Sequence, residues 1–157
     1  MSLSSKLSHF RVTDAKFVTG GKKGGGRMIE VRLEGAKILP AQTIQIVEHE
    51  PWIGSWWKTR NSKKILLDDD AATKDKYILS LAIHEVVEKW VYETFFKGTP
   101  ISKVYSTCHR TAQNLERTYH QQKWGKESWK EYSKIVNKAY RKERRYEESD
   151  KAKATSR

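Results

Sequence analysis

The first half of the chain alternates hydrophobic and polar residues, whereas the second half repeats its hydrophobic residues at helical spacing. In residues 28–33, Ile29, Val31 and Leu33 alternate with polar residues, which is the pattern of a half-buried strand. Other short apolar stretches indicate further strands, at Phe10–Thr19, Ile38–Leu39, Ile44–Val47 and Ile65–Leu67. We expect these strands to form a small antiparallel sheet.

Three helices should follow the strands. Their expected bounds are Thr73–Phe96, Ser102–Lys123, and Glu127 to beyond Tyr140. The Gly98-Thr99-Pro100 turn after the first helix is so short that the first two helices should pack antiparallel. Hydrophobic residues of the third helix predict a core stripe, formed by Trp129, Tyr132, Val136 and Tyr140. A small sheet packed against three C-terminal helices is an α+β fold.

The length of 157 residues suits one domain. We expect this domain to cover residues 1–145, with a flexible Gly-rich loop at 20–27 and a basic polar tail at 146–157. Cys108 is the only cysteine, so no internal disulfide is possible. No apolar run approaches the roughly 18 residues of a membrane span, and no signal-like segment opens the chain. These features predict a cytoplasmic protein with no membrane partner.

The net charge of +12, from 31 Lys+Arg and 19 Asp+Glu, favours polyanionic partners such as nucleic acid. The basic residues concentrate in the Gly-rich loop, at Lys22, Lys23 and Arg27, and in residues 138–157. Three tryptophans could stack on single-stranded bases or could fill the core of the sheet layer: Trp52, Trp56 and Trp57. A soluble protein with a basic tail explains the same composition.

Asp68, Asp69 and Asp70 end the last predicted strand just before the first helix. Acidic residues in this position suit the positive N-terminal end of a helix dipole. They also suit a hard cation such as Mg²⁺ or Ca²⁺, although their spacing does not match an EF-hand loop. Capping of the helix is the simpler interpretation.

The first helix contains His84-Glu85-Val86-Val87-Glu88. Helical residues advance by about 100° each, so His84 and Glu88 face the same way, about 40° apart. They lie at the edge of an apolar stripe made of Leu79, Ile83, Val87 and Val91. A histidine and a carboxylate one turn apart can chelate one cation. Glu85 then occupies the place of the general base in the His-Glu-x-x-His helix of zinc peptidases.

The second helix carries His109, Glu116 and His120 at intervals of seven and four residues, within about 40° of each other. They flank an apolar stripe made of Val104, Cys108, Ala112, Leu115 and Tyr119. If the two helices pack antiparallel, histidines and carboxylates from both can converge. Ordinary helix-edge ion pairs would explain the same residues, for example between Glu88 and Lys89.

These residues predict a zinc site with three protein ligands, His84, Glu88 and His109. Histidine and carboxylate ligands together suit zinc best. Glu85 would take a proton from a water at the metal. Glu116 would be a fourth ligand or a partner that orients an imidazole. A purely structural metal that clips the two helices together is the alternative.

The chain from about Met28 to Tyr140 resembles a family of small phage-encoded zincin-like proteins that are classed as metallopeptidases. The resemblance is carried by three stretches: Ile65-Leu66-Leu67-Asp68, Ile83-His84-Glu85-Val86-Val87-Glu88, and His109-Arg110-Thr111-Ala112-Gln113-Asn114-Leu115-Glu116. Glycine, aromatic and tyrosine positions after the second helix are similar too, at Gly125, Trp129 and Tyr132.

The resemblance implies a zinc-dependent hydrolase of phage or viral origin, in the host cell or the virion, that acts on a peptide or protein. It implies metal-site roles for His84, Glu85, Glu88, His109 and Glu116. The helix motif ends in Glu88 where standard zinc peptidases have histidine, so peptidase activity follows by analogy. The alternative is a basic nucleic-acid or virion-associated binding protein on a zincin-like scaffold, with a structural metal or none.

Overall fold

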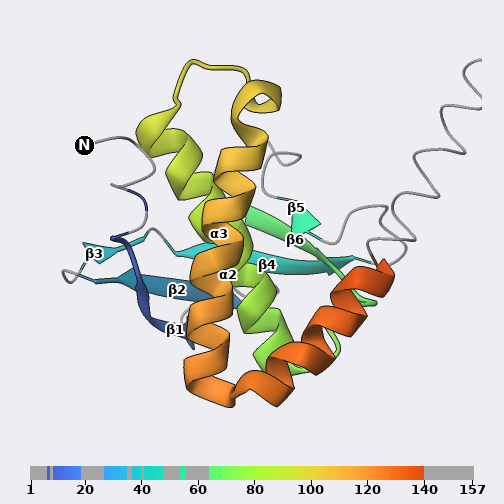
Figure 1. The fold of residues 1–157 in the computed structure, drawn as a ribbon. Helices are drawn as coiled ribbons and strands as arrows, with labels where there is room; N and C mark the ends of the chain where they lie inside the picture. The colour runs from blue at the N-terminus through green and yellow to red at the C-terminus, as the bar shows by residue number, and fades with distance from the viewer. Residues whose placement is uncertain are drawn as a thin grey trace, which may run out of the picture.

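The computed structural model describes residues 7, 9–18, 27–34, 37–39, 41–47, 54–55 and 64–139 (Figure 1). Its strands are β1 (Val12–Val18), β2 (Met28–Leu33), β3 (Lys37–Ile38), β4 (Gln42–Val47), β5 (Gly54–Ser55) and β6 (Lys64–Asp68). Its helices are α2 (Asp75–Phe95), α3 (Ile101–Trp124) and a last helix at residues 126–139. The α+β class, with a sheet followed by three helices, is confirmed.

The sheet is mixed, whereas the alternation pattern led us to expect an antiparallel one. Its strand order is β1-β2-β4-β6-β5, with β3 paired to β2. Strands β4 and β6 run parallel, from Thr43 opposite Lys64 to Val47 opposite Asp68. Alternation reports which side of a strand is buried, and it carries no information about strand direction. The short strand β5, which pairs with β6 at the edge of the sheet, was not predicted.

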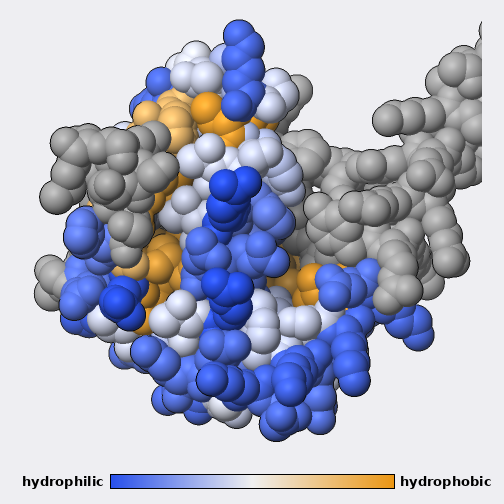
Figure 2. All heavy atoms as spheres, in the orientation of Figure 1, coloured by the Kyte–Doolittle hydropathy of each residue, from blue (hydrophilic) through white to orange (hydrophobic). Residues whose placement is uncertain are grey.

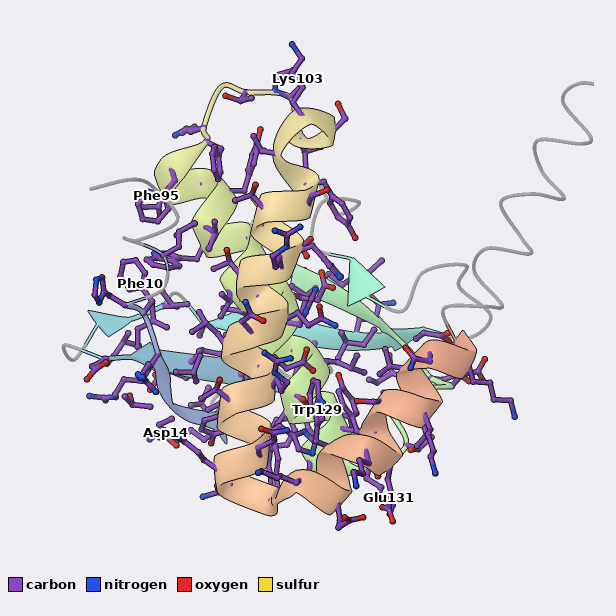
Figure 3. The ribbon with its side chains drawn as sticks, in the orientation of Figure 1. Phe10, Asp14, Phe95, Lys103, Trp129 and Glu131 are labelled. Atoms are coloured by element: carbon purple, nitrogen blue, oxygen red, sulfur yellow. The ribbon has the colours of Figure 1, made fainter. Side chains whose placement is uncertain are left out.

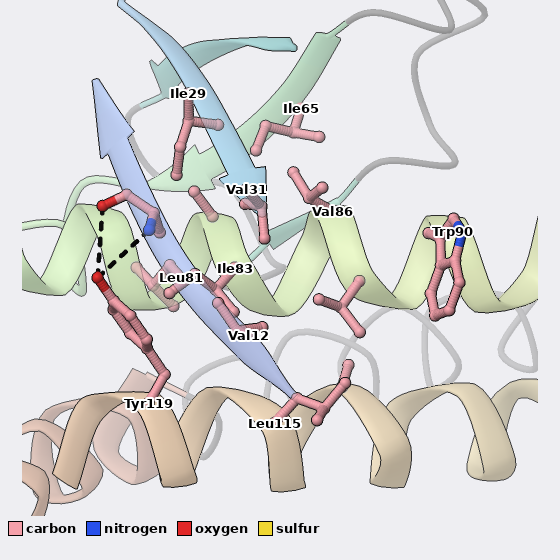
Figure 4. Close-up of a cluster of buried hydrophobic side chains, with 14 of the residues drawn as sticks. Val12, Ile29, Val31, Ile65, Leu81, Ile83, Val86, Trp90, Leu115 and Tyr119 are labelled. Carbon is pink, nitrogen blue, oxygen red and sulfur yellow. Dashed lines mark hydrogen bonds between the residues drawn. The ribbon is translucent and has the colours of Figure 1, made fainter. Parts of the chain in front are cut away.

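Alternating residues of the sheet build one side of the hydrophobic core. Ile29, Val31 and Leu33 of β2 are buried, as their spacing predicted, and Ile65 and Leu67 of β6 join them. Figure 4 shows Ile29, Val31 and Ile65 facing α2. The sheet therefore presents a continuous apolar surface on which α2 packs.

Helix α2 is the centre of the fold, because it lies between the sheet and α3 (Figure 4). The predicted stripe holds for Ile83, Val87 and Val91, which are buried. Burial extends much further, however, over nearly every residue from Ser80 to Val91. The polar residues of this stretch therefore lie inside the protein, whereas their sequence pattern had predicted positions at the edge of the core. A helix covered on two sides has hardly any solvent-facing surface.

Helix α3 packs antiparallel to α2, as the short turn predicted (Figure 1). Gly98 in this turn has a φ of 94°, a backbone conformation that suits glycine, and the Tyr92 hydroxyl donates to the Thr99 carbonyl oxygen at 2.7 Å. The predicted stripe of α3 is buried at Cys108, Ala112, Leu115 and Tyr119, and partly buried at Val104. The result is one broad interface between two long helices.

The last helix crosses the lower ends of α2 and α3 (Figure 1). Gly125 starts this change of direction with φ 94° and ψ 163°, a combination that is essentially restricted to glycine. Tyr132 is buried as predicted, whereas Trp129 and Val136 are partly buried. Trp129, labelled in Figure 3, lies where the last helix meets α3, with its ring 5.3 Å from that of His120.

The three aspartates do not cap α2. The N-cap of this helix is Lys74, and Asp75 is the acidic residue in its first turn. Asp68 instead closes a separate turn before the helix, where its Oδ1 accepts the backbone N–H of Asp70 at 3.3 Å. One ligand atom from each aspartate lies within 4.8 Å of the others, so their second predicted role, cation binding, stays a prediction.

Arg27 belongs to the folded domain, although the sequence placed it in a flexible basic loop. Its guanidinium pairs with Asp75 at 2.8 Å and lies over the Phe17 ring, 4.5 Å from the ring centroid. The rest of the Gly-rich loop, the three tryptophans at positions 52, 56 and 57, Tyr140 and the tail at 146–157 lie outside the described residues. Within the described residues, no helix combines the length and apolar character needed to cross a membrane.

Gly125→Ala should destabilise the protein, because alanine in this backbone conformation costs roughly 1–3 kcal/mol. The space around Gly125 is open, so the loss would come from backbone strain and not from a clash. Urea denaturation of wild type and Gly125→Ala measures the difference in the free energy of unfolding. Lys126→Ala, at the exposed neighbouring residue, is the control, and its stability should lie within about 0.5 kcal/mol of wild type. Equal stability of Gly125→Ala and Lys126→Ala would contradict this account of the bend.

Candidate metal centre

His84 and Glu88 on α2 meet His109 on α3 in a compact triangle of donor atoms. The Nε2 atom of His84 lies 3.1 Å from Glu88 Oε2 and 3.2 Å from His109 Nδ1. The third side, from His109 Nδ1 to Glu88 Oε2, is 3.5 Å. The three side chains predicted as metal ligands are therefore brought together by the antiparallel packing of the two helices.

The size of the triangle fits a zinc ion. A tetrahedral zinc with ligand bonds of about 2.0–2.1 Å spaces its donor atoms about 3.3–3.4 Å apart. The three observed separations, 3.1, 3.2 and 3.5 Å, lie around this value. Two imidazole nitrogens and one carboxylate oxygen are also donors that zinc accepts. The residues present therefore fit the metal that the sequence predicted.

Glu116 lies outside this triangle, where it contacts Nδ1, the ring nitrogen of His84 that is not part of the triangle. Its Oε1 is 3.2 Å from His84 Nδ1, and it is not among the three side chains that could share a cation. The sequence left two roles open for Glu116, a fourth ligand or a partner of an imidazole. The geometry favours the second, because a carboxylate on Nδ1 fixes the ring and leaves Nε2 for the metal.

The centre carries an excess of negative charge. The side chains of Glu88 and Glu116 are only 3% and 5% exposed, and both carboxylates contact His84. Burial alone would lower the pKa of His84, but the hydrogen bonds and charges of Glu116 and Glu88 raise it well above its usual value. A proton on His84 thus offsets part of the charge in the metal-free protein, and a cation would replace it.

The centre opens to solvent on the side of His109. The His109 side chain is 29% exposed, compared with 13% for His84. Tyr105, one turn earlier on α3, stacks on the His109 ring at 5.5 Å and is itself exposed. Three donors among the described residues leave one position of a tetrahedron for water or substrate, which is typical of catalytic zinc sites.

Glu85, the predicted general base, follows His84 on α2 and is buried. It is not one of the three donors, as its predicted role requires. Burial and the charge of Glu116 raise the pKa of Tyr132 well above its usual value, and the charge of Glu85 adds to this effect. Glu85 therefore lies within electrostatic reach of the side chains that surround the centre.

His120 does not join the triangle, although the helical wheel placed it beside His109 and Glu116. Its ring nitrogens instead contact the hydroxyl groups of Ser80, at 3.1 Å, and Ser128, at 2.9 Å. The sequence did not single out either serine. It placed Tyr132 in the core stripe and in the family resemblance, without a role at the metal centre. Ser80 could have been found by its position, since it precedes His84 by one helical turn on the same side of α2.

Cys108, next to His109, is not among the three side chains whose donor atoms meet in the triangle. It is buried, and burial together with the charge of Glu88 raises the pKa of its thiol to about 11. The thiol of the metal-free protein therefore stays protonated at neutral pH.

No protein-family model, curated protein or solved structure matches this chain. The resemblance to phage-encoded zincin-like proteins therefore stays a prediction from the quoted motifs, and the geometry of the centre carries the functional argument.

The metal-free protein should bind about one zinc ion per chain at neutral pH, because three suitably spaced donors are present. The double variant His84→Ala/His109→Ala should bind none. His9→Ala is the matched control, since it removes an exposed imidazole that is not part of the centre. Elemental analysis of untagged protein, after zinc addition and gel filtration, gives the stoichiometry. Equal zinc in the double variant and the control would rule out this centre.

Proposed function

We propose that this protein is a zinc-dependent hydrolase, peptidase-like in its chemistry, with His84, Glu88 and His109 as the metal ligands. One observation carries the proposal: the three donor atoms are 3.1, 3.2 and 3.5 Å apart, as around a tetrahedral zinc. The similarity to small phage-encoded zincin-like proteins supports the same reaction class and a phage or viral origin.

Each side chain then has a separate task. Bound zinc would supply a Lewis acid that polarises a carbonyl group and makes water more acidic. Glu85 would accept the proton of the attacking water and pass it to the leaving amine. Glu116 would keep the imidazole of His84 oriented through Nδ1. The exposed side of His109 would give substrate access to the centre.

A structural zinc is the main competing explanation of the same ligands. A structural site normally has four protein ligands, whereas three donors meet here among the described residues. The 29% exposure of His109 also favours a site that is open to a substrate. These two observations favour a catalytic zinc over a structural zinc that only links α2 to α3.

Glu85→Gln should lower the rate of peptide hydrolysis by roughly 10²–10⁴-fold, the usual contribution of a general base. Zinc content and thermal stability should stay close to wild type, because Glu85 is not among the three donors. Release of fluorescent fragments from dye-labelled casein measures the rate, and Glu93→Gln, an exposed glutamate on the same helix, is the control. Zinc-loaded wild type that cleaves no better than Glu85→Gln would refute the hydrolase and favour the structural zinc.

Nucleic-acid binding is a second candidate, favoured by the exposed side of α3. Lys103, Arg110 and Arg117 follow each other at seven-residue intervals and are exposed, and no exposed residue of α3 is acidic. Figure 2 shows hydrophilic residues along this helix, and Lys103 extends away from the ribbon in Figure 3. Such a row suits phosphate contacts, in addition to the basic loop and tail.

The two candidates respond differently to the same changes. Fluorescence anisotropy measures the binding of a labelled single-stranded DNA. If the row contacts phosphates, the affinity of wild type should fall steeply as the salt concentration rises. The double variant Arg110→Ala/Arg117→Ala should show a smaller salt dependence, by about two phosphate contacts. Glu85→Gln should leave this binding unchanged. Lys134→Ala, an exposed lysine on the last helix, is the control. Binding that is absent, or equal in all variants, would count against a nucleic-acid role for α3.

A further inference from the structure

Glu116 is held in place by two hydroxyl groups that come from different helices. Its Oε2 accepts hydrogen bonds from Ser80 of α2, at 2.7 Å, and from Tyr132 of the last helix. Its Oε1 is occupied by His84 Nδ1. Both oxygens of this buried carboxylate are therefore engaged, which fixes its orientation.

The chain of contacts continues from Ser80 to His120. The Nδ1 atom of His120 lies 3.1 Å from Ser80 Oγ, and its Nε2 atom lies 2.9 Å from Ser128 Oγ. All three side chains are buried. A continuous path of hydrogen bonds thus runs from Ser128, at the start of the last helix, to the imidazole of His84.

Counting hydrogen atoms gives this path a direction. A carboxylate only accepts hydrogen bonds, so the single hydroxyl hydrogen of Ser80 goes to Glu116. Ser80 can then only accept from His120, which must carry its hydrogen on Nδ1. Burial lowers the pKa of His120 and so favours the neutral ring, although the charge of Glu116 and the backbone of Ser128 act in the opposite direction. In the neutral ring with its hydrogen on Nδ1, Nε2 accepts from the Ser128 hydroxyl. The other tautomer would leave two lone pairs facing each other at one of these contacts.

Aromatic rings pack against His120 and Tyr132. Tyr132 stacks on His120, with ring centroids 5.1 Å apart, and Trp124 and Trp129 lie edge-on to the same imidazole. Tyr77 packs against Tyr132 at 5.3 Å. Rings that are packed in this way cannot turn away from their partners, so the Tyr132 hydroxyl is oriented toward Glu116 before any metal binds.

We propose that Ser80, Tyr132 and His120 are positioning residues that hold Glu116 on His84 Nδ1, so that Nε2 of His84 faces Glu88 and His109 and binds the cation that replaces its proton. The proposal rests on the proposed metal centre, and it adds the last helix to the parts of the protein that determine metal affinity. Tyr132 is the most direct member, because it is the only contact to Glu116 from that helix among the described residues.

Tyr132→Phe should weaken zinc binding by about 10-fold, the lower end of the usual cost of losing a partner of a metal-ligating histidine, because Tyr132 acts on His84 through Glu116. Tyr77→Phe is the matched control, since it removes a hydroxyl from the same aromatic group without touching Glu116. Competition with a chromophoric chelator measures the Kd of metal-free protein for zinc. Thermal melts of the two metal-free variants identify any loss of folding. If the tyrosine hydroxyls had a purely structural role, Tyr132→Phe and Tyr77→Phe would both have lower melting temperatures, and the zinc Kd would stay unchanged.

Nitrogen NMR of metal-free protein tests the path independently of zinc. His120 should show a protonated Nδ1 and an unprotonated Nε2, and Ser80→Ala should remove this preference. A proton on Nε2 of His120, or equal zinc Kd values for Tyr132→Phe and Tyr77→Phe, would overturn the proposal. Wild type that binds no zinc would overturn the metal centre instead, and the His120 tautomer would still decide whether the directed path exists.

Discussion

Two carboxylates buried between α2 and α3 impose the main constraint on this fold. Glu88 and Glu116 are almost inaccessible to solvent, and a buried charge is costly unless it is paired and hydrogen-bonded. His84 lies between them, with one ring nitrogen on each carboxylate. The helices must therefore pack in one register, because a shift of one turn would leave charged groups without partners.

This constraint also explains why the helices are arranged as they are. The sheet covers one side of α2, where Lys89 donates to Gln42 of β4 at 3.1 Å. On the other side, Ser80 and His84 of α2 contact Glu116 of α3, and Glu116 also accepts from Tyr132 of the last helix. The turn at Gly98 returns α3 alongside α2, and the bend at Gly125 brings Tyr132 and Ser128 to the polar interface. The hydrophobic core and the candidate metal centre thus share the same two helices.

A polar interface of this kind suits a metal centre better than it suits stability alone. Buried ionic groups rarely stabilise a protein more than apolar residues of similar size. The three donors at tetrahedral separation, and the carboxylate on the far nitrogen of His84, are instead what a zinc ion requires from its ligands and their partners. The exposed row of Lys103, Arg110 and Arg117 lies about 100° around α3 from His109, so this helix could contact a polyanion while it holds one ligand of the candidate metal centre.

The sequence by itself determined the order of the helices and of every described strand except β5, the buried stripe of α3 and the identity of the three clustered donors. These follow from residue periodicity, which depends only on neighbours along the chain. Tertiary structure decided the parallel pairing of β4 with β6, the burial of α2 on nearly every side and the separate positions of His109, Glu116 and His120. A helical wheel gives the direction of a side chain but not its height along the axis. Residues on one side of α3 therefore contact different partners at different positions along α2. Only the packed structure shows which partner each residue contacts.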